Sequence, residues 1–106
     1  MPELQLITIR CVEQEDYSGA DSLVLRVRDD SVWDGELKEG ETASLDHVNP
    51  IPFTDNVKLT LEELDYDPDD DLGTVYVDES ERGQGERQAE FDRDDATYFV
   101  EYEVLA

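Results

Sequence analysis

The stretch VKLTLEELDYDPDDDLGTVYVD occupies residues 57–78. Apolar residues alternate with polar ones on both sides of an acidic segment, which is typical of strands that bury one face. Five of the seven residues from Asp65 to Asp71 are aspartates. Aspartate is a poor strand former, and Pro68 has no backbone N–H to donate. The stretch therefore predicts two strands, residues 57–64 and 74–78, joined by an acidic loop.

The aspartates of this loop favour a bound cation. Crowded carboxylates repel one another unless a cation lies between them. Ca²⁺ accepts six to eight oxygen ligands in a flexible shell, whereas Mg²⁺ keeps several of its waters, and oxygen-only ligands disfavour zinc and copper. The loop therefore predicts Ca²⁺, or a lanthanide in its place. A solvated acidic turn without a metal is the alternative, because the whole chain is acidic.

The rest of the chain also reads as short strands separated by polar turns. Alternation places Ile7, Ile9 and Cys11 on one face of the first strand, and Tyr98, Val100, Tyr102 and Val104 on one face of the last. With no helical period present, the sequence predicts an all-β fold, an eight-stranded antiparallel β-sandwich that forms a single domain over residues 1–106. The further strands are expected at residues 4–12, 22–28, a short one around Val32 and Trp33, 41–53, 87–91 and 97–105.

Strand direction adds to the metal hypothesis. In an up-and-down order, alternate connections lie at the same end of a sandwich, so the connections after the first, third, fifth and seventh strands share one end. That end carries more aspartates than the opposite one. The four connections are residues 13–20, 34–40, 65–72 and 92–96.

The charge of the chain limits its partners. With 30 acidic residues against 8 basic ones, the formal net charge is −22. Nucleic acid binding needs lysines and arginines against phosphates, and an anionic membrane surface would repel this chain. Self-repulsion of this size is tolerated in molar salt, where the screening length is about 3 Å. The balance resembles the proteome of a salt-loving microbe, and a halophile-adapted structural or protein-interaction domain without a specific metal site is the alternative function.

Other features of the sequence point to a non-enzymatic protein of the cytoplasm. The only histidine, His47, has no serine or cysteine partner nearby in sequence, so we expect a surface residue and no catalytic triad. Trp33 is expected to pack rather than to bind sugar, and Cys11 is expected in the core. The chain shows no secretory signal and no apolar run long enough to span a membrane, which favours a cytoplasmic protein.

Two segments resemble the calcium-binding loops of the C2-domain family. Asp16-x-x-Gly19-x-Asp21 is similar to the family's first loop, although that loop is one residue short here. Residues 59–77, LTLEELDYDPDDDLGTVYV, are similar to the third loop, with a compressed spacer. A metal loop after the first strand and a strand at the end of the chain resemble the circularly permuted form of the fold. The resemblance implies Ca²⁺ ions bound at one end of the sandwich.

The resemblance also implies a set of ligands. Asp16 and Asp21 would come from the first loop, and the third loop would supply an Asp-x-Asp pair, a later aspartate and backbone carbonyls. The apolar tips and lysine-rich strand that serve phospholipid binding in the family are not visible here. We therefore expect a metal-stabilised binding module or a small calcium-responsive protein, whose partners are calcium ions and another protein or a second copy. The candidate metal residues are Asp16, Asp21, Asp65, Tyr66, Asp67, Asp70 and Asp71.

Overall fold

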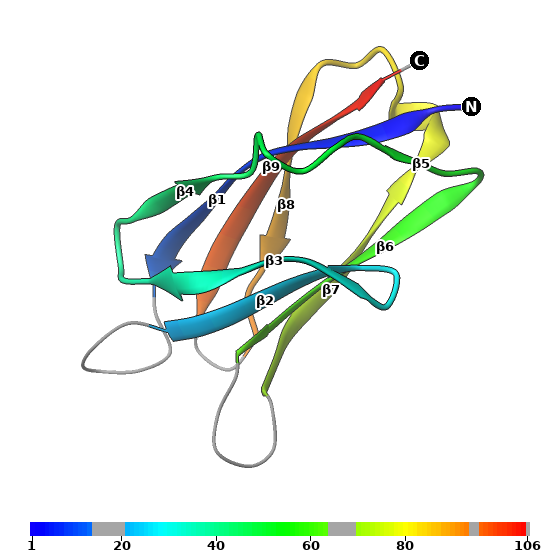
Figure 1. Ribbon diagram of the computed structural model, residues 1–106. Helices are drawn as coiled ribbons and strands as arrows, with labels where there is room; N and C mark the ends of the chain where they lie inside the picture. The colour runs from blue at the N-terminus through cyan, green and yellow to red at the C-terminus, as the bar shows by residue number, and fades with distance from the viewer. Residues whose placement is uncertain (14–20, 64–69, 94–95, 106) are drawn as a thin grey trace.

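The computed structural model describes residues 1–13, 21–63, 70–93 and 96–105, and it forms a sandwich of two antiparallel sheets (Figure 1). This confirms the predicted all-β sandwich. Within the described residues no helix is long and apolar enough to cross a membrane. The elements are β1 (Glu3–Glu13), β2 (Asp21–Val27), β3 (Asp30–Leu37), β4 (Thr42–Ser44), β5 (Ile51–Pro52), β6 (Asn56–Glu63), β7 (Asp70–Asp78), the 3₁₀ turn η1 (Glu79–Glu81), β8 (Glu86–Phe91) and β9 (Thr97–Leu105).

The first and last strands lie at the centre of one sheet. That sheet has the order β4-β1-β9-β8, and β5 pairs with β1 as well. The second sheet has the order β3-β2-β6-β7. Because β9 occupies one edge of β1 along most of its length, β4 and β5 share the other edge. The two sheets therefore differ at their edges, since only the first has a broken edge strand.

The described residues contain nine strands where eight were predicted, because the expected strand at 41–53 is divided. Prolines at positions 50 and 52 lack the N–H that a continuous ladder needs. The chain instead turns after β4, where the Val48 N–H donates to the Leu45 carbonyl over 3.0 Å. It then pairs again only at β5.

Two strands extend four or more residues beyond their predicted bounds. β3 was expected only around Val32 and Trp33, but it continues to Leu37, which pairs with Asp21 of β2. β7 was expected to begin at residue 74, yet it begins at Asp70, opposite Glu63. Pairing with a neighbouring strand thus overrides the low strand propensity of aspartate and glutamate at these positions.

The core consists of the side chains that face inward from both sheets. The alternation in β6 and β9 is confirmed, since Val57, Leu59 and Leu61 and the four inward residues of β9 are buried. In β1 the prediction is wrong for Ile7, which is only partly buried. The pairing of β1 shifts between Leu6 and Thr8, so a bulge at Ile7 reverses the alternation. The inward residues of β1 are Leu4, Leu6, Ile9 and Cys11.

A second bulge makes a glycine necessary at the start of β7. The register of β6 with β7 shifts between Leu61 and Glu62, opposite Gly73 and Asp71, which leaves Leu72 as the extra residue. Leu72 is fully buried. Gly73 has a φ of +142°, and a Cβ built on it would lie 3.3 Å from the Phe91 Cα. Backbone strain and close packing therefore both require glycine at this position.

We expect Gly73→Ala to destabilise the protein by about 3 kcal/mol, because alanine enters a backbone region essentially reserved for glycine and meets the Phe91 backbone. Gly83→Ala is the matched control, since Gly83 has a φ of +75° and no atom within 4 Å of a built Cβ. That change should cost only about 1 kcal/mol. Urea unfolding of both variants in molar KCl measures the difference, and equal losses would show that the approach to Phe91 is unimportant.

A polar cluster closes the end of the sandwich that lies opposite the aspartate loops. Asp78 and Glu81 cap the 3₁₀ turn reciprocally, with the Ser80 N–H donating to Asp78 Oδ1 over 2.9 Å. The Tyr102 hydroxyl donates to Glu81 Oε1 over 2.6 Å, and Arg87 Nε lies 3.3 Å from the same oxygen. Burial, with the hydrogen bond and charge of Glu81, raises the pKa of Tyr102 well above its ordinary value.

We expect Tyr102→Phe to reduce the loss of stability at alkaline pH. In the folded protein the pKa of Tyr102 is raised above its ordinary value, whereas an unfolded tyrosine ionises at about pH 10. The raised pKa of Tyr102 therefore contributes to the free energy of unfolding. This contribution is complete below about pH 10 and declines as the pH rises toward the folded pKa. Urea unfolding at several pH values above neutrality measures the slope. Tyr76→Phe, at a side chain that is 63% exposed, is the control, and an unchanged slope in Tyr102→Phe would contradict this explanation.

Candidate functional site

Four connections of the sandwich begin and end at one pole, which we call the loop pole. β1 reaches it at Glu13, which pairs with Thr97 at the start of β9. The turn between β3 and β4 lies against β1, because the Cys11 N–H donates to the Glu41 carbonyl over 2.9 Å. The Gly40 N–H donates back to the Cys11 carbonyl over 2.8 Å. These contacts join the first sheet to the end of β3.

The second sheet completes the ring of strand ends. Asp21 pairs with Leu37, and Glu63 pairs with both Leu23 and Asp70. The Arg93 N–H, just after β8, donates to the Leu72 carbonyl over 3.1 Å and ties the second sheet back to the first. The expectation that these four connections share one end of the sandwich therefore holds for the strand ends to which they attach (Figure 1).

The predicted metal residues fall into two groups. Asp16, Asp65, Tyr66 and Asp67 lie outside the described residues. Asp21, Asp70 and Asp71 are placed by their backbones alone. They start β2 and β7, so they lie at the loop pole. In the part of the chain that the structure describes, no three histidine, cysteine, aspartate or glutamate side chains are close enough to hold a metal ion.

The structure adds an acidic residue that the sequence analysis did not select. Glu63 ends β6 with its side chain 2% exposed, and it is the buried charged residue of the described core. Its backbone pairs with Asp70, and its strand pairs with β2 two residues from Asp21. The signal was present in the sequence, because alternation from Val57, Leu59 and Leu61 places residue 63 on the inward face.

The opposite pole carries acidic residues too, with a different geometry. The turn between β2 and β3 uses Arg28 and Asp29, with Arg28 at a φ of +59°. Asp30 begins β3 and pairs with Val27. Asp29 and Asp30 are both exposed, so solvent screens them. No buried carboxylate accompanies them in the described residues of that turn.

Strand pairing also gathers basic residues that are scattered in the sequence. Arg26, Arg28 and Lys58 line a depression of about 350 Å³ on the outer face of the second sheet. Arg26 Nε lies 2.6 Å from Glu62 Oε1, and an Arg28 Nη atom donates to the Pro52 carbonyl over 2.7 Å. Asp29 and Glu62 line the same depression. Both arginines are therefore engaged within the protein, and this face is not a purely cationic surface.

The comparisons with known proteins agree with this architecture. No protein-family model matches the chain, and no curated protein matches it. Among solved structures the chain is similar to that of the A and B C2 domains of Extended-Synaptotagmin 2, with a TM-score of 0.55 and 16% sequence identity over 97% of this chain. The fold is C2-like.

This similarity confirms the fold that the sequence resemblance implied, and at 16% identity it shows the fold alone. The chain spans 40% of the length of that structure, which comprises two C2 domains. The sandwich is thus comparable in extent to one domain of that protein. The chemistry of this C2-like chain therefore depends on its own residues at the loop pole.

Proposed function

We propose that this C2-like chain is a non-enzymatic Ca²⁺-binding module whose metal site lies at the loop pole. The observation that carries the proposal is the arrangement around Glu63. β6 ends there with a buried carboxylate, and the strands on either side begin with Asp21 and Asp70. The pairing of three neighbouring strands thus brings acidic residues to the same end of the sheet, where the aspartate-rich segment begins.

The donors available at this pole suit Ca²⁺. Carboxylate and backbone carbonyl oxygens are hard ligands, and Ca²⁺ accepts six to eight of them in a flexible shell. Asp16, Asp65 and Asp67 would supply carboxylates from the connections, and Tyr66 a backbone carbonyl. Asp21, Asp70 and Asp71 would supply carboxylates from the first residues of their strands. The bound ion would offset repulsion among these groups and fasten the connections to the sandwich.

A role in binding rather than catalysis is proposed from the remaining residues. His47 is exposed on the connection between β4 and β5, whereas the acidic residues gather at the loop pole. We propose calcium as the first ligand, and a protein or a second copy of this chain as the partner that responds to it. The alternative is an acidic domain adapted to high salt without a specific metal site. The exposed acids of the opposite pole favour that alternative.

We expect Ca²⁺ to raise the melting temperature of the protein in molar KCl, because only the folded chain brings the ligands together. In calorimetric titrations, Asp65→Asn combined with Asp67→Asn should weaken Ca²⁺ binding at least tenfold, which corresponds to about 1.4 kcal/mol. The matched control combines Asp29→Asn with Asp30→Asn, which removes the same charge from the opposite pole. Similar behaviour of the two double variants would contradict the proposed metal site and show that the carboxylates act only as a diffuse acidic surface.

A second pair of variants tests the position of the site. Glu63 and Glu62 are neighbours on opposite faces of β6, one buried at the loop pole and the other bonded to Arg26 on the outer face. Glu63→Gln should weaken Ca²⁺ binding severalfold, because it removes a poorly screened charge beside the proposed ion. Glu62→Gln should leave the Ca²⁺ affinity nearly unchanged. Equal effects in the same titration would place the ion elsewhere.

A further inference from the structure

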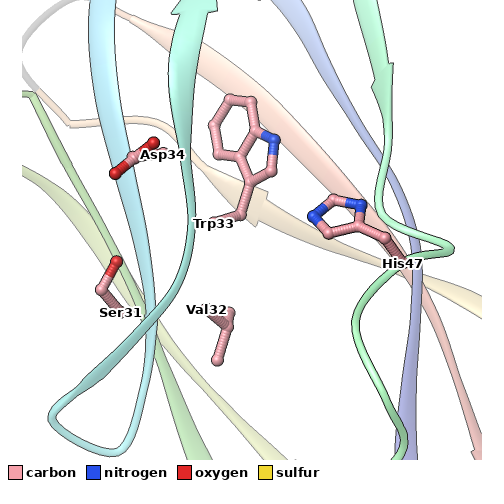
Figure 2. A pocket seen from close by; sticks show the side chains of 5 residues that line it. All are labelled: Ser31, Val32, Trp33, Asp34 and His47. Atoms are coloured by element: carbon pink, nitrogen blue, oxygen red, sulfur yellow. The ribbon is translucent and has the colours of Figure 1, made fainter.

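A groove lies on the open side of the sandwich between β3 and the connection from β4 to β5 (Figure 2). It has a volume of about 340 Å³ and is lined by Ser31, Val32, Trp33, Asp34 and His47. Four of these residues are consecutive in β3, and the fifth comes from the connection. The groove therefore follows the edge of a strand, with one wall supplied by the other sheet.

The local structure of β3 turns an aromatic ring toward this groove. Trp33 pairs with Leu25 and Ser31 pairs with Arg26, so Val32 is the extra residue of a bulge. Such bulges redirect side chains at sheet edges. Trp33 packs partly against the core, and its ring needs Gly35, since a Cβ there would lie 2.7 Å from indole Cζ2. The His47 imidazole points toward the indole from the opposite side (Figure 2).

The backbone of β3 at this groove is able to pair with another strand. β3 is the last strand of its sheet, and in the described residues no strand pairs with its outer edge. It is eight residues long, which is enough for an extended peptide to add to the sheet. The side chains of an added strand that point toward the core would enter the groove beside Trp33.

Charge decides what kind of strand this edge accepts. The exposed residues of β3 include Asp30, Asp34 and Glu36, and no lysine or arginine lines the groove. A second copy of β3 would bring the same carboxylates alongside, so like charges disfavour self-pairing. A basic side chain would instead gain attraction from Asp34 and from a chain of net charge −22. Trp33 pairs with Leu25 and Asp34 pairs with Val24, so the two side chains project from opposite faces of β3. In an added strand, one side chain would therefore face Asp34 and the next would face the indole.

We propose that the outer edge of β3 binds an extended basic peptide segment, with a lysine or arginine side chain beside Asp34 and the neighbouring side chain in the groove between Trp33 and His47. The backbone of the segment pairs with β3, so its side chains alternate between these two faces of the sheet. This site lies on a different part of the molecule from the loop pole and does not depend on the proposed Ca²⁺ site.

The chain contains a built-in reporter for this site, because Trp33 is its only tryptophan. The probe is an acetylated and amidated peptide in which lysine alternates with valine, and binding is followed by Trp33 fluorescence. We expect saturable binding that persists in part in molar KCl, since backbone pairing and aromatic contacts are local. The glutamate version of the peptide should not bind. Signal loss for the lysine peptide in molar KCl, or equal binding of the two peptides, would overturn the proposal.

Two further probes test the strand-pairing step. A lysine peptide with N-methyl groups on alternate backbone amides loses the donors that pair with β3, so its affinity should fall at least tenfold. Nα-acetyl-lysine methylamide carries the charge without a strand and should bind far more weakly than the peptide. If either probe binds as tightly as the peptide, the groove is a small-cation site and no strand adds to β3.

Variants with matched charge test the residues of the groove. Asp34→Asn should weaken peptide binding severalfold, whereas Asp46→Asn should have little effect. Both aspartates are exposed, but only Asp34 lines the groove, although Asp46 adjoins His47 in sequence. His47→Ala removes one wall, and Gly35→Ala displaces the indole without removing it, so both should weaken binding severalfold. Equal losses for the two aspartate variants would show a diffuse attraction and contradict the site.

Discussion

The alternation of inward apolar and outward polar side chains holds this fold together, because it keeps the acidic residues of the described chain, Glu63 excepted, out of the core. The strands that contribute most to the centre, β1, β2, β6 and β9, each bury a continuous apolar face, while their outward faces are mostly polar. A single shift of register would bring carboxylates into the core. The bulges at Ile7 in β1 and Leu72 in β7 are therefore accommodated by residues that keep the inward face apolar after each shift.

Glu63 is the exception to this separation, and its position explains the polarity of the molecule. Burying a carboxylate costs free energy unless its surroundings compensate for the lost hydration, so a buried carboxylate marks a specialised position in the fold. It occurs at the end of the sandwich where β2, β6 and β7 meet and where the aspartate-rich segment begins. The other pole uses a different solution, in which Glu81 accepts a hydrogen bond from Tyr102 and lies beside Arg87. One end of the sandwich thus joins acidic side chains to a tyrosine and an arginine, and the other carries acidic residues at the ends of three strands.

Alternation was readable from the sequence, but strand pairing was not. The faces of β6 and β9 follow from apolar residues at every second position, and the division of the predicted strand at 41–53 follows from Pro50 and Pro52 once pairing is known. The extension of β7 to Asp70 depends on the partner strand, and propensity alone pointed the other way. The groove could not be predicted either, because Trp33 lies in β3 and His47 in the connection between β4 and β5, and the two come together only in the folded chain. The inward position of Glu63 was predictable from the alternation in β6, but Glu63 was not singled out among the many acidic residues.

The pairing of β1 with β9 places the two ends of the described chain side by side (Figure 1). The central pair of the first sheet therefore joins residues separated by almost the full length of the sequence. During synthesis, β1 has no partner on its main edge until β9 has left the ribosome, so the first sheet forms last. Contacts of such long range make folding slow, because a large loop must close before the pairing is gained. An acidic nascent chain repels itself and its neighbours during that interval, which keeps the exposed strands of unfinished molecules apart.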